Sequence, residues 1–310
     1  MKPGLAGIIL CSLMCILIFG SGCTEKHVSS DNATPVVTQV TPAPETSQDI
    51  SDYVKNAVLY AKKVGKAAAI ASFNNKSGPF VKGDLYIYAI DFSGTTLAQP
   101  YNTHLLGKNY MNVTDASGKS TTNLGISLAK SGGGFLLYKY PKPVDNFTSS
   151  YKISYISPVD DTYFIGAGIY TSEDQLIDKT LKKFVYDARN YSLLYGREKA
   201  LKEFNNLNGP FINGELYIFA YDYNGTLLAW PYRPDLVGAN RYNSIDPMGT
   251  YHIKAMIDTA RNGSGLVDYY SVNPATNMTD LKISYVTNVD GTWFLGSGRY
   301  IVPGQSQISI

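Results

Sequence analysis

Apolar residues recur at helical spacing in two long stretches of the chain. In residues 51–73, the apolar positions are Val54, Ala57, Val58, Ala61, Val64 and Ala68. A second stretch begins near Glu173 and extends to Asn206, with a stripe of Leu176, Ile177, Leu181, Phe184, Ala188 and Tyr191. At about 1.5 Å per residue the second helix would be about 50 Å long. The pattern predicts two long amphipathic helices, the second serving as a spine between two modules.

The segment after each helix is typical of strands. GDLYIYAID and TTLAQP, and their counterparts GELYIFAYD and TLLAWP, flank a Gly-containing turn and predict a hairpin. SLAKSGGG and IDTARNGSG predict a short helix that ends at glycine. Three further runs predict an antiparallel meander: FLLYKY, YKISYISPV and TYFIGAGIY, repeated as LVDYYSV, LKISYVTNV and TWFLGSGRY. Each half is therefore predicted to be an α+β module with helix on one face of its sheet.

The two halves are copies of one module. Residues 78–101 align without gaps to residues 209–232, and 15 of these 24 positions are identical. DDTYFIGAGIY at 160–170 returns as DGTWFLGSGRY at 290–300. A single period of this length indicates a duplicated domain rather than a solenoid. We place module 1 at residues 51–170 and module 2 at residues 173–301.

The N-terminal residues 1–23 have the layout of a secretory signal, with Lys2, an apolar stretch and small residues before Cys23. GSGC resembles a lipobox, in which Cys23 is lipidated and becomes the mature N-terminus, although Gly20 stands where Leu is usual. The alternative is an uncleaved membrane anchor. Either way we expect the rest of the chain on the extracytoplasmic face of the membrane. Residues 24–50 are a predicted disordered Ser/Thr/Pro linker, and residues 302–310 are a tail.

Composition narrows the function classes. A net charge of +2 gives no basic surface for a nucleic acid. All three cysteines lie in residues 1–23, which excludes disulfides, thiol catalysis and Cys-ligated zinc from the body of the chain. His27, His104 and His252 form no repeated set, and no HExxH, GxSxG or Walker motif is present. We therefore expect no enzyme activity, no metal site and no cofactor.

Glycosylation acceptors are frequent. Each of eight asparagines begins an Asn-x-Ser/Thr triplet: Asn32, Asn75, Asn112, Asn146, Asn190, Asn224, Asn262 and Asn277. Such triplets mark exported surface, and with the lipobox they favour an archaeal cell surface. The alternative is a loop composition rich in Ser, Thr and Asn. The triplets also leave open a structural or adhesive cell-surface glycoprotein as a second function.

The order of elements resembles the Cache family, the PAS-like extracytoplasmic sensing modules of prokaryotic receptors, and most closely its single-Cache class. The resemblance rests on GELYIFAYDYNGTLLAWPYRPDLVG (214–238), the Gly-rich helix end and KISYVTNVDGTWFLGSGRY (282–300). It implies two tandem modules, each a long N-terminal helix plus an antiparallel sheet, that bind a small molecule, often a short organic acid. Only IVPGQSQISI follows the last strand, so we expect no output domain and a membrane receptor or transporter as partner.

Candidate ligand residues gather where the hairpin ends in AQPY and AWPY, since proline stiffens that exit. The candidates are Trp230, Tyr232, Arg233, Arg241, Tyr285 and Tyr217 in module 2, and Gln99, Tyr101 and Tyr155 in module 1. An arginine suits a carboxylate because its guanidinium gives two parallel hydrogen bonds. For Arg233 and Arg241 the alternative is a solvated loop. For Tyr217, as for Tyr86, Tyr88 and Phe219, core packing is the favoured interpretation.

Two further patterns concern the strands and their turns. Gly166, Gly168, Gly296 and Gly298 alternate in the last strand of each module, which marks close approach by a ligand or by the packed helix. Asp91, Asp222, Asp160 and Asp290 are expected to brace turns. Gln99 and Asn102 stand at the equivalents of Trp230 and Arg233, so we expect module 2 to bind a small anion more tightly than module 1.

Overall fold

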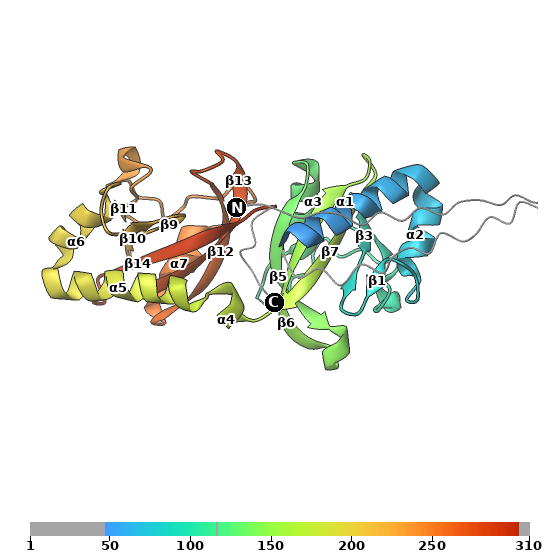
Figure 1. Ribbon diagram of the computed structural model, residues 1–310, viewed down its shortest axis with the longest axis horizontal. Coiled ribbons are helices and arrows are strands. Elements are labelled where there is room, and N and C mark those ends of the chain that lie inside the picture. Colours follow the sequence, from blue (N-terminus) through green and yellow to red (C-terminus); the bar gives the residue numbers. More distant parts are fainter. Residues whose placement is uncertain (1–46, 116, 304–310) are drawn as a thin grey trace, which may run out of the picture. The chain divides into compact units, whose positions relative to one another are not determined.

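The computed structural model describes residues 47–115 and 117–303. The signal segment with Cys23, the linker up to residue 46 and the tail from residue 304 lie outside this range. The described residues form two modules of the same α+β topology, coloured blue to green and yellow to red in Figure 1. The predicted fold class, two PAS-like modules that each combine helix with an antiparallel sheet, is confirmed.

Module 1 contains a five-stranded antiparallel sheet in the order β4-β3-β7-β6-β5. Its helices are α1 (Ser47–Val64), α2 (Lys66–Asn74) and α3 (Thr121–Lys130), with short 3-10 turns η1 (Thr103–Leu105) and η2 (Pro143–Asp145). Its strands are β3 (Tyr88–Asp91), β4 (Thr96–Ala98), β5 (Gly134–Lys142), β6 (Thr148–Pro158) and β7 (Tyr163–Thr171), preceded by the small ladder of β1 (Val81–Lys82) and β2 (Leu85–Tyr86).

Module 2 repeats this sheet in the order β11-β10-β14-β13-β12. Its helices are α4 (Glu173–Leu176), α5 (Lys179–Tyr195), α6 (Arg197–Phe204) and α7 (His252–Arg261), with the 3-10 turn η3 (Pro234–Leu236). Its strands are β10 (Phe219–Asp222), β11 (Leu227–Ala229), β12 (Ser264–Val272), β13 (Thr279–Asn288) and β14 (Trp293–Ile301), preceded by the ladder of β8 (Ile212–Asn213) and β9 (Leu216–Tyr217).

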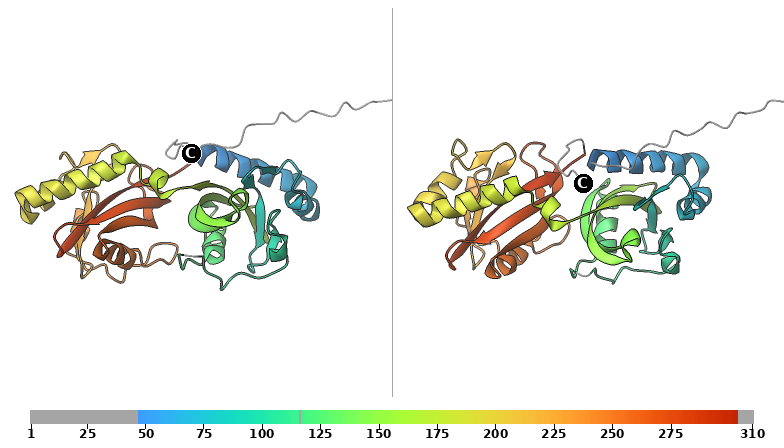
Figure 2. Two further views of the ribbon diagram at one scale, coloured as in Figure 1. Left: turned by 90° about the horizontal axis from the view of Figure 1, so that it is seen from below. Right: turned by 60° about the horizontal axis from the view of Figure 1, so that its bottom comes forward.

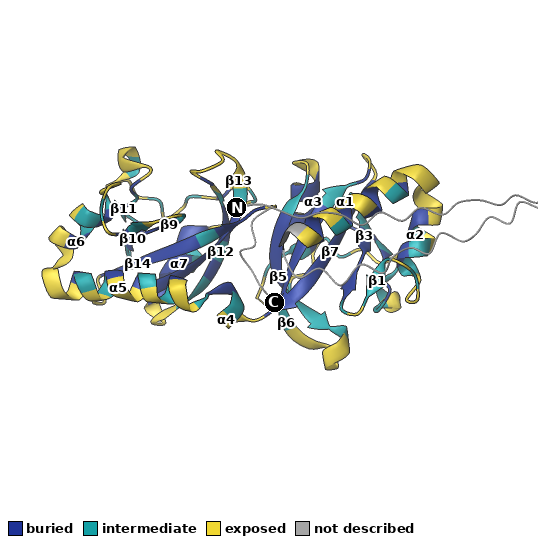
Figure 3. Ribbon diagram, in the orientation of Figure 1, coloured by how far each residue is buried: buried dark blue, intermediate teal, exposed yellow. Residues whose placement is uncertain are grey.

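Each sheet is covered by a long helix on one face and a short helix on the other (Figure 2). Strand alternation assigns the side chains to these faces. In β7, Ile165 and Ala167 pack with Val54 of α1, whereas Phe164 lies against Gly125 of α3 on the opposite face. The central strands are buried and the long helices are exposed on their outer sides (Figure 3).

The long helices are interrupted, which corrects the prediction of continuous helices over 51–73 and 173–206. Gly65 separates α1 from α2 and Gly196 separates α5 from α6, both with φ 83°. Each glycine amide still closes the preceding helix, because Gly65 N donates to Ala61 O and Gly196 N donates to Ser192 O, both at 3.0 Å. A further break precedes Asp178, which caps α5 by accepting from Leu181 N at 2.7 Å. The predicted 50 Å spine is therefore absent.

Neighbouring strands account for the glycines of the last strand. Gly166 pairs with Tyr88 across β3 and β7, and a Cβ at Gly166 would lie 2.5 Å from the Tyr88 ring. Gly296 stands in the same relation to Phe219, at 2.8 Å. Gly168 and Gly298 make room for a serine of the adjacent strand, Ser154 or Ser284. The close approach that these glycines mark is made by neighbouring residues of the sheet itself and not by the long helix.

The turn-bracing role of the four aspartates is confirmed. Asp91 Oδ1 accepts hydrogen bonds from Ser93 N at 2.9 Å and Thr95 N at 2.8 Å. Asp222 Oδ1 accepts in the same way from the amides of residues 224 and 226, and Asp160 and Asp290 accept from the amides of residues 162 and 292.

Each sheet buries one lysine at an equivalent position. Lys152 Nζ lies 3.9 Å from the centroid of the Tyr86 ring and 4.7 Å from that of Tyr170, with no hydrogen-bond partner among the described residues. Lys282 Nζ donates to Tyr217 Oη at 2.8 Å and lies 4.9 Å from the Tyr300 centroid. Burial lowers the pKa of both ammonium groups to about 7. The aromatic faces stabilise the charged form only in part.

We expect Gly196→Ala to destabilise the protein by about 1–3 kcal/mol, because its φ of 83° is strained for a residue with a Cβ. In an uninterrupted helix the same change would stabilise by about 1 kcal/mol. Urea denaturation distinguishes the two signs. Asn190→Ala, at an exposed position inside α5, is the control and should raise stability slightly. A more stable Gly196→Ala variant would show that α5 and α6 form one helix in solution.

The free energy of unfolding should rise with pH from 6 to 9 in the wild type relative to Lys152→Met. An unfolded lysine titrates near 10.4, whereas the folded pKa is about 7. Above pH 7 the unfolded state therefore binds more protons, so the penalty of burying Lys152 is full below pH 7 and is relieved as pH rises. Urea titrations at several pH values measure the difference, with Lys139→Met as the control. A difference that does not change with pH would contradict the assignment.

Candidate functional site

Each module contains a cavity on the sheet face opposite its long helix. Cavity 1, in module 1, has a volume of about 910 Å³ and lies between β3, β4, β5, α3 and the loop of residues 99–115. Cavity 2, in module 2, has a volume of about 560 Å³ and is bounded by the equivalent elements. Both volumes suit a small molecule.

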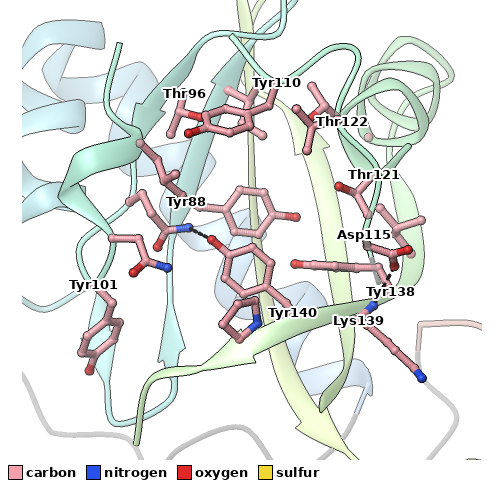
Figure 4. A pocket seen from close by; sticks show the side chains of 18 of the residues that line it. Tyr88, Thr96, Tyr101, Tyr110, Asp115, Thr121, Thr122, Tyr138, Lys139 and Tyr140 are labelled. Atoms are coloured by element: carbon pink, nitrogen blue, oxygen red, sulfur yellow. Dashed lines mark hydrogen bonds between the residues drawn. The ribbon is translucent and has the colours of Figure 1, made fainter. Parts of the chain in front are cut away.

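Phenol groups dominate the wall of cavity 1. Tyr88, Tyr110, Tyr138 and Tyr140 all contribute to it, and their rings surround the central space (Figure 4). Tyr138 Oη and Ser154 Oγ are 2.9 Å apart on the floor. Burial raises the pKa of Tyr88 to about 12, so this phenol is neutral at ordinary pH. The wall therefore offers hydroxyl groups on an otherwise apolar surface.

One amide group in cavity 1 is incompletely satisfied. Gln99 is 6% exposed, and its Nε2 donates to Tyr140 Oη at 3.1 Å. Its Oε1 is buried and accepts no hydrogen bond from the described residues. The Gln99 backbone is fixed as well, because its amide donates to Asn74 Oδ1 at 2.9 Å. Gln99 thus has a buried acceptor without a partner among the described residues, held in a fixed position.

The charged residues on the wall of cavity 1 interact with other groups or lie on the exposed edge of the cavity. Asp115 accepts from Ser117 N at 2.8 Å and Lys119 N at 2.9 Å through Oδ1, and from Lys139 N at 2.9 Å through Oδ2. The Lys139 ammonium lies 5.0 Å from the Tyr151 ring centroid and points away from the cavity (Figure 4). His104 lies on the exposed turn η1.

Cavity 2 contains a cation and two unpaired buried nitrogens. The Arg241 guanidinium lies 5.4 Å from the centroid of the Trp230 ring and forms no ion pair within residues 47–115 and 117–303. Trp230 Nε1 and His252 Nδ1 are buried, and neither has a hydrogen-bond partner in the described part of the chain. The His252 ring stacks on Tyr269, with centroids 5.0 Å apart. Burial lowers the pKa of His252; the Asp246 carboxylate opposes this effect, and the nearby Arg241 adds to it.

An aspartate supports the loop of cavity 2 without competing for these groups. Asp246 Oδ1 accepts from Met248 N at 2.9 Å and Thr250 N at 2.8 Å, and Oδ2 accepts from Tyr270 N at 2.9 Å. Burial raises the pKa of Tyr221 to about 12, an effect that the adjacent Arg241 opposes. Cavity 2 therefore has the Arg241 guanidinium and the Asp246 carboxylate on its wall, together with two buried ring nitrogens that have no hydrogen-bond partner among the described residues.

The two cavities differ at equivalent positions. Arg241, His252, Trp230 and Tyr221 of cavity 2 stand 131 residues after Tyr110, Thr121, Gln99 and Ile90 of cavity 1, and all eight line their cavities. Arg241 and His252 of cavity 2 are thus replaced by Tyr110 and Thr121 in cavity 1. Trp230 and Tyr221 are replaced by Gln99 and Ile90.

Seven of the nine candidate residues line a cavity: Trp230, Tyr232, Arg233, Arg241 and Tyr217 in cavity 2, and Gln99 and Tyr101 in cavity 1. Arg233 is exposed, and its guanidinium already forms two bonds to Asp235, at 2.9 and 2.8 Å. Tyr101 donates to Gly83 O at 2.6 Å. Tyr86, Tyr88, Tyr217 and Phe219 are buried and also line the cavities.

The other two candidates lie on the opposite face of their sheets. The Tyr155 ring centroid is 5.7 Å from Lys55 Nζ of α1, and Tyr285 Oη is 3.0 Å from Tyr186 Oη of α5. Sequence reasoning also missed Tyr110, Thr121 and His252. These residues could have been found by comparing the two copies in the loop before the short helix, where their sequences differ. No single motif reveals them.

The described residues give two further findings. No cluster of three or more His, Cys, Asp or Glu side chains among them is arranged to hold a metal ion. None of the described helices has the length and apolar character needed to cross a membrane.

Comparison with known proteins identifies the family of this chain. Residues 26–302 match the Cache domain family. The sensor histidine kinase MctS of Rhizobium johnstonii is 35% identical over 86 residues, which is 27% of this chain, and the match spans only 19% of the length of that curated relative.

Among solved structures, a methyl-accepting chemotaxis protein from Vibrio parahaemolyticus is 23% identical, covering 39% of this chain and 86% of the other with a TM-score of 0.35. The ligand-binding domain of the Pseudomonas fluorescens chemoreceptor CtaA, in complex with L-isoleucine, is 14% identical, covering 80% and 82% with a TM-score of 0.25. Because the family match spans almost the whole chain, the protein belongs to the Cache domain family of extracytoplasmic sensor domains.

Proposed function

We propose that this protein is a lipid-anchored, extracytoplasmic sensory protein that binds small molecules, and that cavity 2 takes a short carboxylate. The observation that carries the proposal is the convergence of Arg241, Trp230 Nε1 and His252 Nδ1 on one enclosed space. All three residues line cavity 2, and Trp230 Nε1 and His252 Nδ1 have no hydrogen-bond partner among the described residues.

A carboxylate satisfies these groups better than a neutral ligand does. The guanidinium fork matches two carboxylate oxygens, and an indole N–H can only donate, so it requires an acceptor. A buried donor without a partner costs about 1–3 kcal/mol, which an anionic ligand would recover. Asp246 does not compete for Arg241, because backbone amides already occupy its oxygens.

The proposal treats the chain as two single-Cache units. Each module has its own helices, its own five-stranded sheet and its own cavity, which supports two binding units in tandem. A structural or adhesive glycoprotein would have no use for buried, unpaired donors around a cavity. A membrane receptor or transporter partner would then read the ligand-bound state.

Arg241→Met should abolish or weaken carboxylate binding 10- to 100-fold, because a charge-assisted hydrogen bond contributes about 1.5–3 kcal/mol. The probes are acetate, propionate, succinate and phenylacetate, each paired with its neutral amide. Thermal shift identifies the best acid, and calorimetry measures its affinity. Arg233→Met is the matched control and should change affinity less than threefold, since Arg233 is exposed and bonded to Asp235.

Two outcomes would overturn this assignment. The first is that no acid in the panel binds more tightly than its amide. The second is that Arg233→Met weakens binding more than Arg241→Met does. The first would remove the anion site, whereas the second would move it to the exposed end of the cavity.

Anchoring is tested separately at Cys23, which lies outside the described residues. Because lipidation requires the thiol, we expect Cys23→Ser to release the protein from the membrane fraction or to stop its maturation. Intact-mass measurement of the native protein should show a lipidated N-terminus at Cys23. A native chain that still carries residues 1–22 would contradict the lipoprotein assignment and favour an uncleaved anchor.

A further inference from the structure

Cavity 1 has the form of a binding site but a different chemistry from cavity 2. At about 910 Å³ it is the larger of the two. Tyr110 and Thr121 replace the arginine and histidine of module 2, so no guanidinium or imidazole stands at these positions. A carboxylate entering cavity 1 would lose its hydration without gaining an ionic partner, which is costly.

Cavity 1 is an equally poor site for a cation. The one carboxylate on the wall, Asp115, already accepts three backbone amides and the Ser117 hydroxyl at 2.6 Å. Behind the rings of Tyr86 and Tyr140 lies the Lys152 amine, 3.9 and 5.6 Å from their centroids. Lys152 does not line the cavity, and its charged form would repel a cationic ligand.

The polar group of cavity 1 that is free to bind a ligand is a hydrogen-bond acceptor. Gln99 Oε1 is unpaired, its side chain is almost completely buried, and its orientation is held by the bond from Nε2 to Tyr140 Oη. An unpaired buried acceptor recovers its desolvation cost when a ligand donates to it. The phenol rings around it supply apolar surface and hydroxyl groups for the rest of the ligand.

We infer that cavity 1 is a second ligand site, specific for an uncharged molecule that combines an apolar body with a hydrogen-bond donor, such as a carboxamide or an alcohol. The ligand donates to Gln99 Oε1 and packs its apolar body on the tyrosine rings. The inference does not depend on the carboxylate site, because the two cavities share no lining residue.

Three probes of matched size test the charge selectivity: phenylacetamide, phenylacetate and phenethylammonium. Calorimetry is performed on the full mature chain carrying Arg241→Met, so that cavity 2 does not take the acid. We expect phenylacetamide to bind at least tenfold more tightly than either charged probe. Equal affinities, a preference for phenylacetate or phenethylammonium, or no binding by any of the three probes would overturn the inference.

Variants at Gln99 locate the site. Gln99→Met keeps the side-chain length and removes the acceptor, so it should weaken phenylacetamide binding about tenfold, consistent with the loss of one buried hydrogen bond. Gln99→Glu places a charged acceptor at the same point and should shift the preference to phenethylammonium. Tyr155→Phe, on the opposite face of the sheet, is the control and should leave all three affinities unchanged.

Thermal melting of each variant confirms that it folds, and the Gln99→Glu gain for the cation is informative even if Gln99→Met is unstable. Phenylacetamide binding that is unaffected by both Gln99 variants would place the amide elsewhere and refute the assignment. If the chain does not bind carboxylates in cavity 2 but still binds phenylacetamide, the proposed function fails and this inference stands.

Discussion

Side-chain alternation along the sheet is the constraint on which each module depends. Because successive residues point to opposite faces, β7 places Ile165 and Ala167 against α1 and keeps Phe164, Gly166 and Gly168 for the cavity face. The glycines then allow the Tyr88 ring and the Ser154 hydroxyl to lie across the strand. A side chain at Gly166 would displace the Tyr88 ring and change the floor of cavity 1.

The fold was largely predictable because the strands and short helices have local sequence patterns that occur in both modules. The helix breaks were not, since a single glycine in an amphipathic stretch is tolerated in many helices. Gly65 and Gly196, however, stand 131 residues apart at equivalent positions. A repeated glycine inside a helical pattern is better explained by a backbone that needs positive φ, which both residues adopt, than by chance.

The site was less predictable because its residues meet in space and not along the chain. Trp230 to Arg233 form a compact sequence motif, yet Asp235, two residues further on, takes the Arg233 guanidinium. Arg241, which comes from the next loop, also lines cavity 2 and forms no ion pair among the described residues. His252 has no histidine partner in module 1, and only folding places it near Arg241 and Trp230 on one wall.

Comparison of the two copies separates the residues that hold the fold from the residues that differ on the cavity wall. The copies retain the buried lysine, the last-strand glycines and the loop aspartate, Asp115 or Asp246, whose oxygens bind three backbone amides. Replacing the loop aspartate would leave buried amides unpaired, and replacing a last-strand glycine would force a strand apart, at a cost of a few kcal/mol. The four wall positions that differ between the copies line the cavities and take no part in these turn and strand contacts. The side chains of the wall can therefore differ in charge while the frame is unaltered, as Arg241 in cavity 2 and Tyr110 in cavity 1 do.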